Sequence, residues 1–345
     1  MDRKPHPASI CSGSPAGRVP RCRAAALALG LALSGCGEGG PLELKLAHAA
    51  PPEAMIAVAA AEFARVANER LEGRATVVVY GAGQLGDDRD ALQKLKLGTL
   101  DLALPSTVMS AEVPAFALFD MPYIVDDREH MRRIEEEIFW PDLAPRAEDR
   151  GYRVLALWEN GFRHITNSVR PIVSPQDLAG IKIRTPNSPW RVSLFRALGA
   201  NPSPMAFSEV FLALQTGLMD GQENPLTNIQ NASFDEVQRY LSLTRHLYSP
   251  AYLTVGVEQW ARIPADVRAI VEEVARETQA FVFERARELD ARILDELREG
   301  GMEVNEVDPL LFVGASRAVY DEFDARVPGG GSWVEEARAL AREGN

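Results

Sequence analysis

The chain has 345 residues, of which 46% are hydrophobic and 25% are charged. This composition is ordinary for a soluble globular protein, and the length allows a sizeable core and two domains. The formal net charge is −12, and no basic stretch interleaves with aromatic residues, which argues against nucleic acid as a partner. Since an acidic surface repels anions at long range, any anion site has to be local and cationic.

The first 36 residues have the features of an export signal. Three arginines between residues 18 and 23 precede an apolar run, 24–33, that is too short to cross a bilayer as a mature helix. The LSGC sequence that ends at Cys36 resembles a bacterial lipobox, in which the cysteine is lipidated. We therefore expect a lipoprotein-type signal peptide over 1–36, a glycine-rich tether over 37–42, and attachment to the membrane through a lipid on Cys36.

Cysteine and histidine usage predicts no metal, disulfide or other cofactor in the mature chain. Of the three cysteines, Cys36 alone remains once the signal is removed, so an intramolecular disulfide and a cysteine metal site are both impossible. The five histidines show no spacing typical of metal ligands.

The mature chain begins with alternating strands and helices. We expect a strand over 42–48, where apolar and polar residues alternate, a helix over 53–71 with an apolar stripe, and a buried strand over 76–80. His48, at the end of the first strand, is either a residue of a ligand crevice or an ordinary loop histidine.

A glycine-rich turn follows the second strand. Residues 81–86 (GAGQLG) match the G-x-G-x-x-G fingerprint of dinucleotide sites. However, Asp87 and Asp88 begin the next helix, 87–97, where a pyrophosphate would need a positive environment. The following strand, 100–104, offers no acid for a ribose hydroxyl. We therefore interpret the two aspartates as helix caps rather than as part of a dinucleotide site.

The stretch 158–190 carries two arginines, Arg163 and Arg184, in apolar surroundings typical of strands. Side chains alternate along the IKIR segment, 181–184, and the proline that follows ends the strand. Arg184 is thus predicted at the C-terminal end of a strand, where open α/β sheets present their ligand crevice. The planar guanidinium suits a carboxylate. For either arginine taken alone, a surface salt bridge remains the alternative.

The rest of the chain is predicted to be mainly helical, apart from a strand over 153–158 and a compact polar turn over 219–225. The predicted helices cover 188–198, 207–216, 264–299, 309–323 and 333–341. The third of these has no internal proline or glycine, and at 1.5 Å per residue it would reach roughly 50 Å. Such a helix has to lie along both domains or break.

Five features in this order resemble DctP-type substrate-binding proteins of tripartite ATP-independent periplasmic (TRAP) transporters. They are GAGQLGDDRDALQKLKLGTLDLAL, ENGFRHITNS, LAGIKIRTPNSP, PMAFSEVFLALQTGLMDGQENP and the long C-terminal helix. The resemblance covers roughly residues 43–325. It implies a periplasmic protein with an α/β, periplasmic-binding-protein-like fold: two lobes around a central cleft, crossover strands, and a long helix spanning both lobes. Lobe I would comprise 43–160 and 250–288, and lobe II 161–249 and 289–345.

The resemblance also implies a ligand site. Arg184 would be the main carboxylate clamp and Arg163 a second cationic contact. Asn224, in the QENP motif, would be a hydrogen-bond partner. Phe207 would form a wall of the pocket, and His48 would approach from the first lobe.

Further candidates come from the residues themselves. Trp158 and Trp190 are predicted as apolar faces for a sugar ring, and Asn187 and Glu223 are additional polar candidates. Sialate-binding members carry an acid where this chain has Ser106, which argues against a large amino sugar. The nearby aromatic and polar groups suit a hydroxylated sugar acid such as a uronate or aldonate. A C4-dicarboxylate or a 2-oxo acid is the alternative.

The implied function is non-enzymatic capture of an organic acid and its delivery to TRAP permease subunits in the membrane. An exported enzyme acting on acidic sugars is an alternative, but the sequence has no G-x-S-x-G elbow and no cluster of metal ligands. A sensory protein that presents its ligand to a receptor kinase would share the same pocket.

Overall fold

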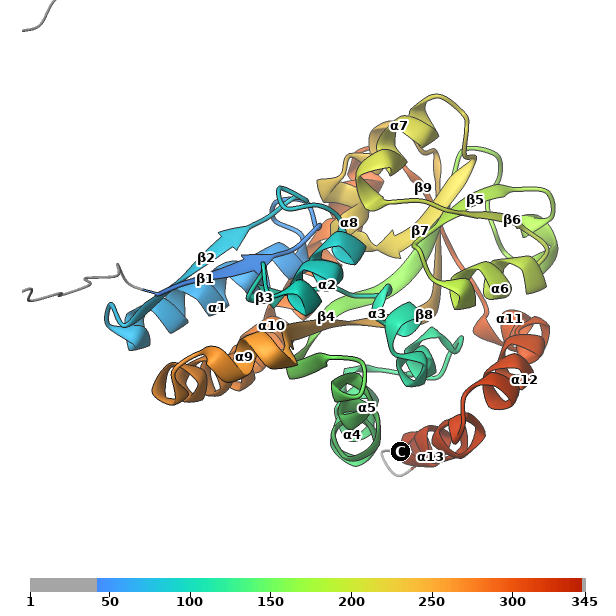
Figure 1. Ribbon diagram of the computed structural model, residues 1–345. Coiled ribbons are helices and arrows are strands. Elements are labelled where there is room, and N and C mark those ends of the chain that lie inside the picture. The colour runs from blue at the N-terminus through green and yellow to red at the C-terminus, as the bar shows by residue number, and fades with distance from the viewer. Residues whose placement is uncertain (1–41, 343–345) are drawn as a thin grey trace, which may run out of the picture. The chain divides into compact units, whose positions relative to one another are not determined.

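The computed structural model describes residues 42–342 (Figure 1). The predicted signal peptide, Cys36 and the tether up to residue 41 lie outside the described residues. Within them, the strands form a single mixed sheet. The strands are β1 (Leu42–Ala47), β2 (Ala75–Tyr80), β3 (Leu102–Ala103), β4 (Tyr152–Asn167), β5 (Lys182–Thr185), β6 (Asn201–Pro204), β7 (Gly221–Pro225), β8 (Tyr240–Gly256) and β9 (Glu303–Glu306).

Two long antiparallel strands, β4 and β8, hold the sheet together. The strand order is β2-β1-β3-β8-β4-β7-β5-β6, and β9 pairs with β8. β1 pairs in parallel with β2 and β3 on one side, whereas β5 pairs in parallel with β6 and β7 on the other. Figure 1 shows β4 and β8 running between these two ends of the sheet. The chain thus crosses between the ends twice within the sheet itself.

Helices cover the sheet on both faces. They are α1 (Met55–Leu71), α2 (Asp88–Leu97), α3 (Met109–Glu112), α4 (Arg128–Ile134), α5 (Ala144–Glu148), α6 (Pro189–Ala197), α7 (Val210–Gln215), α8 (Leu226–Asn231), α9 (Val257–Arg262), α10 (Ala265–Glu299), α11 (Pro309–Ala315), α12 (Arg317–Arg326) and α13 (Gly330–Arg342). Buried apolar side chains form two clusters. Tyr252 belongs to one and its neighbour Leu253 to the other, because successive residues of a strand point to opposite faces.

The helix α2 begins as the sequence predicts. The Asp87 carboxylate accepts hydrogen bonds from the backbone N–H groups of Arg89 and Asp90, and the Asp90 carboxylate accepts one from the Asp87 N–H. This reciprocal capping box satisfies donors that the first turn leaves free. Gly98 ends the helix with a φ of 68°, a left-handed conformation that glycine adopts without steric cost.

The long helix α10 is unbroken over 35 residues, as predicted. Near its start, Glu277 pairs with Arg70 of α1. Near its end, Glu296 accepts a hydrogen bond of 2.5 Å from Gln230 of α8. Two residues before Glu277, the Ala275 carbonyl accepts a hydrogen bond from the indole of Trp158 in β4. The helix therefore packs against elements from both ends of the sheet. No helix among residues 42–342 combines the length and apolar character needed to span a membrane.

The polar turn predicted over 219–225 is wrong. Residues 221–225 form β7, a fully buried strand that pairs with β4 on one side and β5 on the other. The sequence GQENP lacks the apolar alternation of a strand. It is nevertheless accommodated because its polar side chains pair with each other and with β4, so none is left buried without a partner.

Candidate ligand-binding site

A cavity lies between segments that come from the two ends of the sheet. One wall comes from the segments after β1 and β3 and the start of α2, and the other from β4, β5, β7 and α8. The polar residues that line it are Asp87, Asp88, Ser106, Thr107, Asn160, Arg163, Arg184, Asn187, Asn224 and Asn228.

Arg184 presents a cation to this cavity without a carboxylate partner. It is only 3% exposed, and its Nε and Nη2 both donate to the Met205 carbonyl, at 3.0 and 2.6 Å. It forms no ion pair with any residue in 42–342. Burial lowers its pKa to about 9, with Glu223 opposing the shift and Arg163 adding to it. The guanidinium therefore stays charged at neutral pH and needs an anion.

Arg163, by contrast, is paired with a buried carboxylate. Its Nε donates to Glu223 Oε2, and its Nη2 donates to Glu223 Oε1 at 3.0 Å and to the Glu223 carbonyl at 2.7 Å. Arg191 Nη1 lies 3.5 Å from the same carboxylate, and His246 Nε2 lies 3.3 Å from it. Burial alone would raise the pKa of Glu223, but the two arginines and the His246 hydrogen bond hold it well below its usual range.

The ion pair also orients Asn224. Arg163 Nη2 donates to Asn224 Oδ1 at 3.1 Å, and Asn224 Nδ2 donates to Gln222 Oε1 at 2.5 Å. Arg163 thus serves both as a wall of the cavity and as the group that fixes the neighbouring amide. Arg191 and His246 were not candidates from the sequence, because they reach Glu223 from α6 and β8 and no local pattern connects them.

Phe207, which the resemblance implies as a wall of the pocket, lies beside Arg184. Its ring centroid is 5.9 Å from Arg184 Cζ, within the range of a cation–π contact. Asn187 and Ser106 also line the cavity. Of the ten candidates, six therefore meet in one place: Arg184, Arg163, Asn224, Phe207, Asn187 and Ser106.

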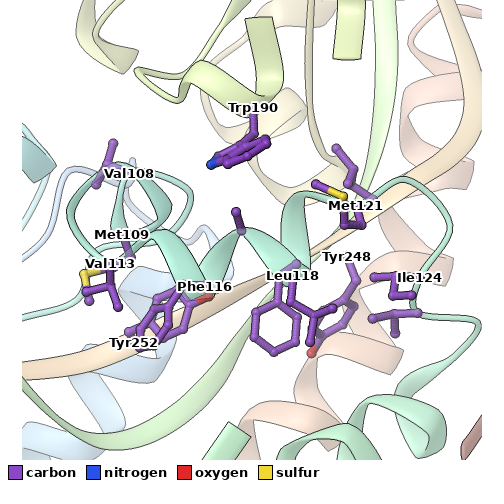
Figure 2. Close-up of a cluster of buried hydrophobic side chains, with 14 of the residues drawn as sticks. Val108, Met109, Val113, Phe116, Leu118, Met121, Ile124, Trp190, Tyr248 and Tyr252 are labelled. Carbon is purple, nitrogen blue, oxygen red and sulfur yellow. The ribbon is translucent and has the colours of Figure 1, made fainter. Parts of the chain in front are cut away.

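The prediction that Trp158 and Trp190 form apolar faces of the site is wrong, because neither side chain lines the cavity. Trp158 is 1% exposed, packs on Phe63 and donates from its indole to the Ala275 carbonyl at 2.9 Å. Trp190 belongs to the apolar cluster shown in Figure 2 and packs edge-on against Phe323. Both rings are core residues, so we do not retain them as stacking surfaces for a ligand.

His48 and Glu223 are buried behind the cavity wall. The His48 ring lies against Gly81, where an added Cβ would come within 2.9 Å of it. The first glycine of GAGQLG therefore makes room for a side chain. Burial lowers the pKa of His48 to about 4, so the ring is neutral and adds no charge to an anion site. Glu223 contacts Arg163 rather than the cavity.

Besides Asp87 and Thr107, three polar cavity residues were not candidates from the sequence. Asp88 was interpreted as a cap, but its side chain faces the cavity; burial and the neighbouring Asp87 raise its pKa to about 7. Asn160 lies at a β-bulge between β4 and β8. On either side of it, Glu159 pairs with Pro250 and Gly161 pairs with Ser249. Bulges of this kind redirect a side chain.

The third missed residue, Asn228, lies on the first turn of α8. It stands four residues after Asn224, but Asn224 belongs to β7, so no helical spacing connects the two in the sequence. Within 42–342, no group of three or more His, Cys, Asp or Glu side chains could hold a metal ion. The site is thus a polar, partly cationic chamber suited to a small organic anion.

Comparison with known proteins agrees with this chemistry. The family of bacterial extracellular solute-binding proteins, family 7 (DctP), matches residues 46–326. The 2,3-diketo-L-gulonate-binding periplasmic protein YiaO of Escherichia coli is 33% identical over 276 residues, which cover 79% of this chain and 84% of YiaO.

Two solved structures share the fold. The sugar acid binding protein DctPAm from Advenella mimigardefordensis, in complex with galactonate, has a TM-score of 0.84 and 29% identity, covering 89% of this chain and 99% of that one. A TRAP periplasmic solute-binding protein from Sulfurospirillum deleyianum with bound succinate has a TM-score of 0.83 and 29% identity, covering 87% and 99%. The chain is therefore a member of the DctP family, the periplasmic and non-enzymatic solute-binding proteins of TRAP transporters.

Proposed function

We propose that this protein captures a sugar acid, such as a uronate or aldonate, through a carboxylate clamp at Arg184 and delivers it to a TRAP permease. The observation that carries the proposal is the buried Arg184 guanidinium, which faces the cavity and has no carboxylate partner in the described chain. A ligand carboxylate supplies the missing charge through two parallel hydrogen bonds.

The walls of the cavity support a hydroxylated ligand. The residues Asp88, Asn160, Asn187 and Asn228 add hydrogen-bonding groups along the cavity. A galactonate-bound relative of the same fold points in the same direction. A C4-dicarboxylate is the second candidate, because a relative of equal similarity holds succinate.

The proposal is tested by calorimetry with D-galactonate, D-glucuronate and succinate on the mature chain. Arg184→Ala should weaken the tightest of these ligands by at least about 100-fold, or about 2.7 kcal/mol, because the ligand carboxylate would then be buried without a partner. Arg196→Ala, on the exposed side of α6, is the matched control and should bind as the unaltered chain does. Nearly unchanged affinity in the Arg184 variant would refute the clamp.

Closure and anchoring complete the proposal. We propose that two lobes, 43–160 with 250–288 and 161–249 with 289–345, close on the ligand. A decrease in the radius of gyration on binding would test this closure.

Lipidation of Cys36 is proposed from the LSGC sequence. Equal labelling of the chain and of a Cys36→Ser variant by a radioactive fatty acid would contradict it.

A further inference from the structure

A chain of hydrogen bonds fixes the direction of three amides that line the cavity, those of Asn224, Asn228 and Asn160. It starts at Arg163, whose guanidinium carries donors only. The Asn224 atom that it contacts at 3.1 Å must therefore be the oxygen Oδ1. The same oxygen lies 3.2 Å from the amide of Asn228, which must present its Nδ2.

The second hydrogen of Asn228 continues the chain. Its Nδ2 also lies 3.4 Å from Asn160 Oδ1, so both amide hydrogens are directed at oxygens of the wall. Asn160 Nδ2 in turn donates to Ser106 Oγ at 3.2 Å, and that hydroxyl donates to the Pro250 carbonyl at 2.6 Å. The orientation of Asn228 is thus determined from both sides.

The side-chain atom of Asn228 that remains unpaired is its acceptor, Oδ1. Its residue is 5% exposed and lines the cavity, and its Oδ1 is buried without a hydrogen-bond partner among the described residues. Leaving a buried acceptor unpaired is unfavourable, and a donor on the ligand would satisfy it. A hydroxyl can donate to this oxygen, whereas a carboxylate would place acceptor against acceptor.

We propose that Asn228 is a specificity-determining residue that accepts a hydrogen bond from a ligand hydroxyl. It thereby selects hydroxylated monocarboxylates over unsubstituted C4-dicarboxylates. This inference rests on the proposed function, since Arg184 has to hold the carboxylate. It assigns a second contact on the same wall of the site, where Asn228 binds a part of the ligand other than its carboxylate.

The test compares one hydroxy acid with one dicarboxylate in two variants. The probes are succinate and whichever of D-galactonate, D-glucuronate and D-erythronate the unaltered chain binds most tightly. Asn228→Leu keeps the approximate volume but removes the acceptor, so preference for the hydroxy acid over succinate should fall at least about tenfold. Asn228→Asp keeps an acceptor and adds a negative charge, which repels doubly charged succinate more strongly than it repels the singly charged hydroxy acid. The preference should therefore be kept or increased.

Three results would overturn the inference: equal weakening of both ligands by Asn228→Leu, a tenfold loss of preference in Asn228→Asp, or tighter binding of succinate by the unaltered chain. If circular dichroism shows that the leucine variant does not fold, the aspartate variant decides alone.

Binding of both probes by Arg184→Ala is measured alongside. If it abolishes binding of both probes while Asn228→Leu leaves their ratio unchanged, then the clamp stands and the role of Asn228 fails. If no probe binds the unaltered chain, the proposed function itself fails.

Discussion

Arg163 and Arg184 lie on the same side of one cavity, yet their surroundings differ in the property that matters most for binding. Arg163 shares a buried carboxylate with Arg191 and His246. Arg184 has a carbonyl oxygen and an aromatic ring, but no anion. The first arginine is part of the fold's own charge balance, whereas the second has no ion-pair partner among residues 42–342, which is why we propose it as the ligand clamp.

This difference shows how one site divides structural and binding roles between identical side chains. A compensated ion pair orients amides at no cost to the ligand. An uncompensated cation makes the empty cavity less favourable and gives that free energy back on binding. Substituting the partners of Arg163 and Arg184 in turn tests whether the two arginines differ in this way.

The largest effect is expected for Glu223→Gln. The variant leaves Arg163 and Arg191 buried without their common anion, so the free energy of unfolding should fall by about 3–5 kcal/mol. Urea denaturation measures it. Arg184→Ala in the ligand-free protein is the matched comparison and should change stability by less than about 1 kcal/mol, because that cation has no partner to lose. Similar losses in both variants would erase the distinction.

A smaller effect is expected from Asp88 as the pH changes. Burial and Asp87 raise its pKa to about 7, against the opposing effects of the Ser106 and Ala49 N–H groups and Arg184. Above this pH the ionised Asp88 offsets part of the Arg184 charge. Affinity for an anionic ligand should therefore fall roughly three- to tenfold between pH 6 and pH 8, as measured by calorimetry at each pH.

Asp88→Asn should remove this dependence on pH, and an equally steep profile in the variant would assign it to another group. Stability follows the same sign. Since the folded pKa exceeds the ordinary value of 3.8, the contribution of Asp88 to stability is complete below about pH 3.8 and is lost as the pH rises through 7.

The smallest effect is expected for Phe207→Leu. The ring contributes a cation–π contact to Arg184, and such contacts at partly exposed sites are worth roughly 0.5–1 kcal/mol. Affinity should fall about two- to fivefold. Phe211→Leu, on the next helical turn and outside the cavity lining, should leave affinity unchanged. A larger loss for Phe211 would mean that local packing, not the contact with Arg184, is responsible.

Much of the fold follows from local pattern. The alternation in 42–48, the caps around Asp87 and the uninterrupted helical stretch 264–299 each predicted an element that the structure contains. The strand β7 could not be predicted in this way, because GQENP is polar. Its burial is made possible by partners on β4 that come from distant parts of the sequence.

The candidate site was predictable at its centre and not at its edges. The IKIR pattern placed Arg184, but the absence of a partner for it is a property of the assembled fold. Trp158 stands two residues before Asn160, and strict alternation would put both on one face. The bulge at Asn160 breaks this relation and sends the tryptophan into the core. A single irregular residue thus decides which side chain lines the cavity.

The position of β8 in the sheet affects how fast the chain folds, because early elements pair with late ones. Helix α1 packs against α10, and β3 pairs with β8, so residues near position 60 find their partners some two hundred positions later. Contacts this distant in sequence slow folding, since a long loop must close before they form. Since β3 and α1 have to wait for β8 and α10, the first hundred residues cannot complete their packing until the last third of the chain is present.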